Sequence, residues 1–226
     1  MAQAMTPKFW LLDAPRNQRP LERAAHPAYD KTFCPANDRH AICRRVDDLR
    51  VIAHPSGLKD FTWTWMSDML ISPKALALFK HHRITGFEVR RVVTEYPNPI
   101  KTQPPKLYEV IITGWGGLPA REAGLTAIES CPTCGYKMFT IAEPSRLIDP
   151  TAWDGSDIFM VWPIPRYPFV TDRLATLIRK EKLSGAKLLP AQEIPMKRGT
   201  TLNPGSLFQW MPEERASQLR QQFGIY

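Results

Sequence analysis

The stretch SPKALALFKHHRITG, residues 72–86, has the features of a complete amphipathic helix with both of its ends. Ser72 can cap the first turn through its hydroxyl, and Pro73 suits the first helical position, where no backbone N–H is needed. Gly86 is typical of a helix stop, because glycine adopts a left-handed backbone without strain. These features predict a helix followed by a strand. The apolar residues that recur at helical spacing are Ala75, Leu76, Leu78 and Phe79.

A second stretch, TDRLATLIRKEKLSG, repeats this pattern at residues 171–185, after a shift of 99 positions. Each copy has the pattern of an aromatic strand, a capped helix, a Ser/Thr-Gly turn and a further strand. We therefore predict one strand-helix-strand unit used twice, at about residues 61–93 and 158–190, as a scaffold whose aromatic residues form core. The shift superimposes Trp63 on Trp162, Ser72 on Thr171, Leu78 on Leu177, and Gly86 on Gly185.

The remaining sequence is typical of one α+β domain with mixed sheets and few helices. The chain has 226 residues, of which 43% are hydrophobic and 23% charged, as in soluble globular proteins. The opening residues 8–12 and the β-branched run 107–113 predict strands. We expect the domain to span residues 1–194 and residues 195–226 to form a tail with a short helix at 212–223.

No segment has the pattern of a membrane span or a secretory signal. A membrane helix needs about 18 or more consecutive apolar residues, and no stretch approaches this length. The first eight residues lack a basic region followed by an apolar run. We therefore expect a cytoplasmic protein with no membrane partner. Four of the 22 prolines lie within residues 97–106, which predicts an extended loop there.

Cys131-Pro-Thr-Cys134-Gly135 has the form of a zinc knuckle. Two residues between the cysteines allow both thiolates to reach one tetrahedral ion, and Gly135 suits the left-handed position after the second ligand. In a reducing compartment such a pair is more often a metal site or redox site than a disulfide. A turn with two free thiols and a redox dithiol stay open as alternatives to a structural zinc ion. A catalytic zinc is disfavoured, because four cysteine ligands leave no position for water.

Cys34 and Cys43 are the candidates for a second pair of ligands. Eight residues separate them, more than in a standard knuckle, but a polar loop that folds back can still bring both to the ion. His40 lies between them and offers a substitute ligand if one cysteine is out of place. The prediction is a structural zinc site, formed by knuckle elements at 34–43 and 131–136, with the ligands Cys34, Cys43, Cys131 and Cys134.

The formal charge of +8 permits a polyanionic partner, but its distribution along the chain favours a solvated surface. Residues 1–60, 61–171 and 172–226 carry net charges of +3, +1 and +4. No segment is a basic arm, so we do not expect nucleic acid as the partner.

No arrangement of residues in the sequence is typical of a catalytic site. Phosphate-binding, dinucleotide-binding and zinc-protease motifs are absent, and no Ser/His/Asp ordering stands out. The segment Gly114-Trp-Gly-Gly117 follows a predicted strand, but it lacks the lysine and the following helix that a phosphate-binding loop needs. We therefore expect a protein that is not an enzyme.

The chain resembles the double-CxxCG motif family of myxobacterial-type proteins, which are similar to immunity proteins of polymorphic toxin systems. The resemblance covers about residues 8–194, but not the tail. At the first pair, Cys34-Pro35 matches the start of the motif, whereas the second cysteine is displaced to position 43 and no glycine follows it. The matching segments are Cys131-Pro-Thr-Cys134-Gly135, the strand at 157–162, the segment 167–171 and the turn Leu183-Ser-Gly185.

The resemblance implies a non-catalytic cytoplasmic protein that binds and neutralises a cognate bacterial toxin domain by protein-protein interaction. The binding surface would then be a patch complementary to the toxin, for which the loop 97–106 and the tail are candidates. A nucleic-acid-binding zinc-ribbon protein is the alternative, because of the positive charge and the cysteines. An unrecognised enzyme or redox protein is a third possibility.

Overall fold

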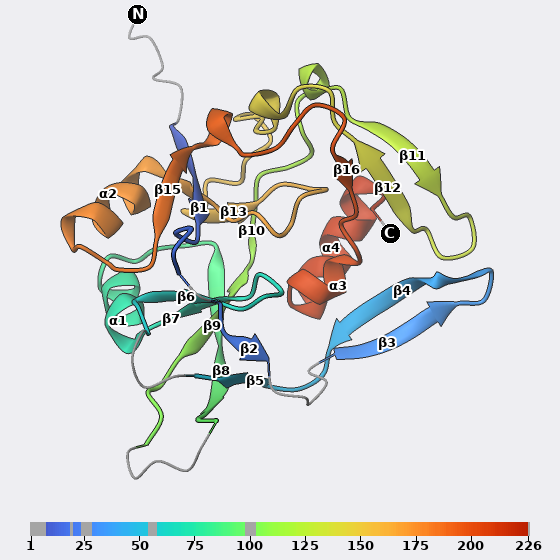
Figure 1. Ribbon diagram of the computed structural model, residues 1–226. Helices are drawn as coiled ribbons and strands as arrows, with labels where there is room; N and C mark the ends of the chain where they lie inside the picture. Colours follow the sequence, from blue (N-terminus) through green and yellow to red (C-terminus); the bar gives the residue numbers. More distant parts are fainter. Residues whose placement is uncertain (1–7, 19, 24–28, 54–57, 98–102, 226) are drawn as a thin grey trace, which may run out of the picture.

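The structure, a computed structural model, describes residues 8–18, 20–23, 29–53, 58–97 and 103–225. Within these residues the chain forms an α+β fold of four helices and several mixed sheets, as predicted (Figure 1). The helices are α1 (Pro73–His81), α2 (Asp172–Lys180), α3 (Leu207–Trp210) and α4 (Glu213–Phe223). Short 3-10 turns are η1 (Arg121–Ala123), η2 (Pro144–Arg146) and η3 (Ala191–Glu193).

Two sheets make up the body of the molecule. The five-stranded sheet has the order β10 (Gly114–Trp115), β13 (Ile158–Met160), β14 (Phe169–Thr171), β1 (Phe9–Asp13) and β15 (Lys187–Pro190). The six-stranded sheet has the order β2 (Glu22–Arg23), β5 (Leu49–Ile52), β8 (Phe87–Glu95), β9 (Tyr108–Ile112), β7 (Met69–Ile71) and β6 (Phe61–Trp63).

Two hairpins project on the side of the molecule away from α1 and α2 (Figure 1). One is formed by β3 (Tyr29–Cys34) and β4 (Asn37–Arg45). The other is formed by β11 (Thr126–Ser130) and β12 (Lys137–Thr140), with β16 (Thr201–Leu202) added beside β12. The expected polar loop around Cys34 is therefore wrong, because β3 and β4 pair as antiparallel strands on both sides of a short turn.

Both predicted helices begin at the expected caps. The Ser72 hydroxyl accepts a hydrogen bond from the backbone N–H of Ala75 at 3.2 Å, and Pro73 occupies the first turn of α1. In α2 the Thr171 hydroxyl accepts from the N–H of Leu174 at 3.4 Å. These bonds satisfy N–H groups that have no partner within a helix, which is why the sequence signal was reliable.

The repeated unit is larger than predicted, because a strand from elsewhere in the chain completes each copy. In the first copy β9 lies between β7 and β8, and in the second copy β1 lies between β14 and β15. The registers agree, since Leu70 is opposite Glu109 and its counterpart Phe169 is opposite Leu11. The first strand of the chain thus holds, in the second copy, the place that β9 holds in the first.

The predicted match of Trp63 with Trp162 is wrong, because the hairpin before α2 is two residues longer than the one before α1. On the first strand of each hairpin, β6 and β13, the copies therefore align with a shift of 97, which places Trp65 on Trp162. Their hydrogen bonds agree: the Trp65 N–H donates to the Leu21 carbonyl at 3.3 Å, and the Trp162 N–H donates to the Gly117 carbonyl at 3.1 Å. Trp63 and Trp162 are nevertheless both buried, so they are core as predicted.

At the glycine that follows its helix, each copy packs against the other copy. We call each of these two contacts a crossing. Gly86 and Gly185 have left-handed backbones, with φ of 85° and 80°. A Cβ atom on Gly86 would lie 2.0 Å from the carbonyl oxygen of Ile158, and one on Gly185 would lie 2.0 Å from that of Phe61. Only glycine fits there, so each helix-end turn packs directly on the first strand of the other copy.

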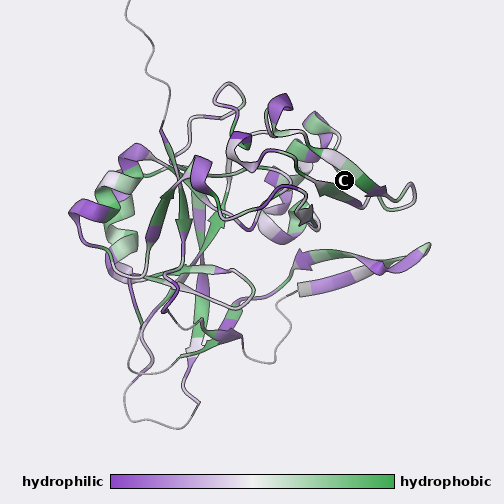
Figure 2. Cartoon of the chain, turned by 45° about the horizontal axis from the view of Figure 1, so that its top comes forward, coloured by the Kyte–Doolittle hydropathy of each residue, from purple (hydrophilic) through white to green (hydrophobic). Residues whose placement is uncertain are grey.

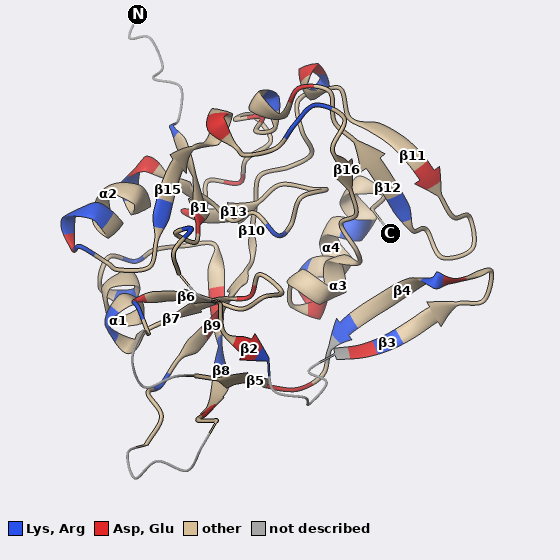
Figure 3. Cartoon of the chain, viewed as in Figure 1, with Lys and Arg blue, Asp and Glu red and all other residues tan. Residues whose placement is uncertain are grey.

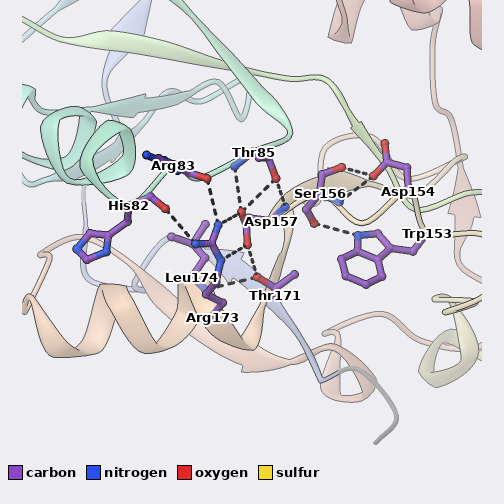
Figure 4. A network of polar contacts seen from close by, with 10 residues as sticks. All are labelled: His82, Arg83, Thr85, Trp153, Asp154, Ser156, Asp157, Thr171, Arg173 and Leu174. Atoms are coloured by element: carbon purple, nitrogen blue, oxygen red, sulfur yellow. Dashed lines mark hydrogen bonds and ion pairs between the residues drawn. The ribbon is translucent and has the colours of Figure 1, made fainter. Parts of the chain in front are cut away.

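An aspartate carboxylate stabilises each crossing, and the one at the first crossing, Asp157, is buried. Asp157 accepts hydrogen bonds from the backbone N–H of Thr85 at 3.0 Å and from the Thr85 and Thr171 hydroxyls at 3.1 and 3.0 Å. The Arg173 guanidinium forms an ion pair with it (Figure 4). Burial by itself raises the pKa of Asp157, but the bonds from Arg173, Thr85 and Thr171 outweigh it and hold this pKa below the ordinary value of 3.8.

Asp60 makes the equivalent set of contacts at the other crossing. It accepts from the backbone N–H and the hydroxyl of Ser184, both at 2.9 Å, and from the Ser72 hydroxyl at 2.9 Å. The Lys74 ammonium group lies 3.9 Å away. Burial raises the pKa of Asp60, and the hydrogen bonds from Ser184 and Ser72 outweigh this effect, so the pKa is lowered. Asp60 and Asp157 therefore make equivalent contacts, and we call these two side chains the clamp carboxylates.

The largest core lies between the sheets and the helices, where apolar residues gather on the central strands (Figure 2). Residues beyond 195 contribute to it, because Leu207 and Leu219 are buried in this core. The helix predicted at 212–223 is observed as α4. Of the predicted loop 97–106, residues 98–102 lie outside the described part. Among the described residues, the helices are too short and too polar to cross a membrane.

Comparing Gly185→Ala with a control should separate the loss of stability caused by steric overlap from the loss caused by backbone strain. The control is Gly155→Ala, because Gly155 has φ of 89° but open space around it. We expect Gly155→Ala to lose about 1–2 kcal/mol of unfolding free energy from backbone strain, and Gly185→Ala to lose about 1–3 kcal/mol more from overpacking. Urea unfolding measures both. Equal losses would contradict the contact with Phe61.

Asp157 should make stability depend on pH in the acid range. Because its pKa is lowered in the folded state, its stabilisation is present above the ordinary pKa of 3.8 and is lost as pH falls through the folded value. The difference in unfolding free energy between the wild type and Asp157→Asn should therefore be constant from about pH 7 to 5 and shrink below about pH 4. The exposed Asp38→Asn is the control. A difference that grows on acidification would contradict the clamp.

Candidate metal centre

The tips of the two projecting hairpins carry three of the four cysteines that the sequence singled out. Cys34 ends β3, and the pair Cys131 and Cys134 lies in the turn between β11 and β12. Cys34 and Cys131 are 97 positions apart, which is also the shift that superimposes β6 on β13. The two hairpins are therefore the same element of the two copies, and their tips lie together.

The second hairpin has the backbone of a knuckle. The Gly135 N–H donates to the Cys131 carbonyl at 2.8 Å, and the Cys131 N–H donates to the Tyr136 carbonyl at 2.8 Å. Gly135 has φ of 72°, the left-handed conformation that the sequence predicted after the second cysteine. In the first hairpin, the Ala36 N–H points to the Cys34 sulfur at 3.4 Å. Such N–H groups stabilise thiolates.

Four side chains converge between the hairpins: those of Cys34, His40, Cys131 and Cys134. Their ligand atoms lie within 4.8 Å of one another, with 3.9 Å between the Cys34 and Cys131 sulfurs and 3.7 Å between the Cys134 sulfur and His40 Nδ1. A tetrahedral zinc ion about 2.3 Å from sulfur and 2.0 Å from nitrogen needs ligand atoms roughly 3.5–3.8 Å apart. The separations of 3.7 and 3.9 Å are close to this range, the four ligand atoms all lie within 4.8 Å, and the cysteines form no disulfide.

The structure brings together three of the four predicted ligands and leaves out Cys43. Cys43 lies in β4 three residues after His40, and side chains of a strand alternate between its two faces, so the two point in opposite directions. His40 is only 6% exposed and takes the fourth position, as the substitute that the sequence offered. Our choice of Cys43 over His40 is corrected here, because that choice assumed a loop where the chain forms a regular strand.

The orientation of His40 is set by neighbours that sequence reasoning missed. Its Nε2 lies 2.8 Å from a carboxylate oxygen of Glu129, and its ring stacks on Tyr136 with 4.0 Å between centroids. A histidine that donates Nε2–H to a carboxylate presents a lone pair on Nδ1, the atom that faces Cys134 here. Glu129 lies two residues before Cys131 in β11, and no sequence signal marks it.

The thiols of the knuckle differ in acidity. The pKa of Cys131 is lowered to about 6, first by the backbone N–H of Cys134 and then by the hydrogen bond with His40. Burial raises the pKa of Cys134 to about 11. The pKa of His40 is raised, because its bonds to Cys131 and Glu129 outweigh burial, which lowers it. Binding of a cation would release the remaining protons, so affinity should increase with pH.

The donor set has the chemistry of a structural site. Three sulfurs and one imidazole nitrogen are the ligands that zinc prefers, and four protein ligands leave no position for water or substrate. Comparison with known protein families finds no family that matches this sequence, and no curated protein matches it either.

Replacement of Cys134 should empty the site, whereas replacement of Cys43 should not. We expect about one equivalent of zinc in the wild type and in Cys43→Ser, and under about one-tenth in Cys134→Ser. Because metal binding contributes to folding, Cys134→Ser should also lose at least about 3 kcal/mol, or roughly 6–12 °C in Tm. Elemental analysis and thermal unfolding measure these changes. Zinc retained in Cys134→Ser, or lost in Cys43→Ser, would contradict the ligand set.

Proposed function

We propose that this protein is an immunity protein of the bacterial cytoplasm, which binds and neutralises a cognate toxin domain and performs no catalysis. The observation that supports this is the union of two Cys-Pro motifs, Cys34-Pro35 and Cys131-Pro132, in one four-ligand cluster. The double motif is the basis of the resemblance to toxin immunity proteins. A cluster without an open position supports a structural role for the metal rather than a reaction at it.

We further propose that the metal is zinc and that Cys34, His40, Cys131 and Cys134 hold it. A bound zinc ion supplies a crosslink between the two hairpins. The hairpin of β3 and β4 otherwise contacts the body mainly at α3 and α4, where Arg44 lies over the Phe208 ring and pairs with Glu213. Zinc would therefore hold the N-terminal copy in the arrangement that the partner meets.

The alternative of a nucleic-acid-binding zinc ribbon has less support at this site. The charges around the cluster are mixed, because Lys31 and Arg39 alternate with Asp30 and Asp38, and Glu129 stands beside His40. A nucleic-acid footprint needs cations that track the backbone, together with exposed aromatic rings. The described side chains of the hairpins include no run of unopposed cations.

Co-expression tests the proposed function. We expect the protein to rescue bacterial cells from the toxin whose gene lies beside its own, and to co-purify with the C-terminal domain of that toxin. An unrelated toxin is the specificity control, and Cys43→Ser should protect as well as the wild type. A folded, zinc-loaded protein that neither protects nor co-purifies would contradict the proposal. Salt-sensitive binding to duplex DNA would then favour the alternative.

A further inference from the structure

The helices α1 and α2 form one face of the molecule, opposite the metal centre (Figure 1). They are linked directly, because the Arg173 guanidinium donates to the carbonyls of His82 at 3.0 Å and Arg83 at 3.2 Å. The start of α2 therefore lies against the end of α1. We refer to residues 72–83 and 171–182 together as the helical face.

The helical face holds most of the net charge of the protein (Figure 3). Residues 72–83 include three basic and no acidic residues, and residues 171–182 include four basic and two acidic residues. Together they carry a net +5 of the total +8. Counting along the sequence missed this concentration, because the two segments are 99 positions apart and meet only in the fold.

The cations of the helical face are duplicated between the copies. Three equivalent positions carry a basic residue in both: Lys74 and Arg173, Lys80 and Arg179, and Arg83 and Lys182. At the last of these positions the backbone is left-handed, with φ of 50° in both copies. A left-handed backbone favours glycine and strains other residues by about 1–2 kcal/mol. Both copies thus have a long cationic side chain at a position where glycine would avoid the backbone strain.

Most of these cations have no anionic partner among the residues that the structure describes. Lys74 and Arg173 pair with the clamp carboxylates. In contrast, five exposed cations form no ion pair among the described residues: Lys80, Arg83, Arg179, Lys180 and Lys182. Cations held together on one side of a fold repel one another and attract an acidic surface.

We propose that the helical face is the docking surface for the protein partner and that the partner presents an acidic surface to it. The inference rests on the proposed function for the identity of the partner, the toxin domain, and adds which surface is used and the charge that it recognises. Complementary charge of this kind mainly increases the rate of association and excludes wrong partners.

Two observations favour an acidic protein over nucleic acid. Phosphates bind well at helix N-termini, but those of α1 and α2 are capped by Ser72 and Thr171, each bonded to a clamp carboxylate. The aromatic ring beside the face, Trp10, is not free to stack on a base. Arg179 lies over it at 4.0 Å, and its Nε1 donates to Asp172. Single-stranded nucleic acid needs such free rings.

Charge reversal tests the helical face by itself. The face variant is Lys80→Glu, Arg83→Glu, Arg179→Glu and Lys182→Glu. The matched control reverses four exposed arginines elsewhere: Arg39→Glu, Arg121→Glu, Arg146→Glu and Arg198→Glu. Both variants are first checked for folding by circular dichroism and zinc content.

The first probe is polyglutamate, which needs no toxin. We expect the wild type to bind it at about 50 mM salt and the face variant to bind at least about tenfold more weakly. The control should stay within about threefold of the wild type.

The second probe is the toxin domain. We expect the face variant to associate with it at least about tenfold more slowly at low salt, with the control within about threefold of the wild type. Equal losses in both variants, or no loss in the face variant, would overturn the inference. So would a loss of toxin binding from Trp65→Ala alone, since Trp65 is 66% exposed on the β6–β7 hairpin, outside the helical face. Tighter binding of a 30-base-pair DNA duplex than of polyglutamate, through the same four cations, would also overturn the inference.

If polyglutamate binds through the helical face but the toxin does not bind at all, the proposed function fails, while the preference of the helical face for an acidic partner stands.

Discussion

The carbonyl oxygens of Phe61 and Ile158 occupy the space that a side chain at Gly185 or Gly86 would need. This contact sets the distance between each helix-end turn and the first strand of the other copy. The clamp carboxylates Asp60 and Asp157 then tie each turn to the cap of the opposite helix. The bonds that Asp157 accepts from Thr85 and Thr171 have counterparts in those that Asp60 accepts from Ser184 and Ser72, so each turn is held by contacts with the other copy.

The candidate metal centre also joins the two copies. Each copy contributes one hairpin, and the tips of the two hairpins lie together. The copies do not contribute alike. With a shift of 97, Asn37 stands where the second copy has Cys134, and Asn37 Nδ2 lies 3.1 Å from His40 Nε2. The first copy instead reaches the cluster with a histidine three residues farther along β4. The duplicated motif has thus become one unequal site that belongs to neither copy alone.

On the opposite side of the molecule, the two copies contribute equivalent residues to one surface. There the helices repeat their cations at three equivalent positions, and the link from Arg173 to the end of α1 merges them into one charged surface. The cluster of four possible metal ligands at one end and the charged face at the other both combine residues of the two copies. The proposed immunity function uses the two together, since a rigid scaffold preserves the charge pattern that a partner recognises.

Local features were readable from the sequence, because caps, turns and the knuckle act through neighbouring residues. Ser72 and Thr171 bond N–H groups three residues away, and Gly135 follows its cysteine directly, so α1, α2 and the turn of the knuckle were predicted with their residues. Only the tertiary structure decided the remainder. The choice of His40 over Cys43 depends on strand alternation in β4, the place of β1 depends on pairing across the whole chain, and the role of Glu129 depends on two hairpins meeting. These interactions join residues far apart in sequence, and their free energies arise only when the two copies close on each other.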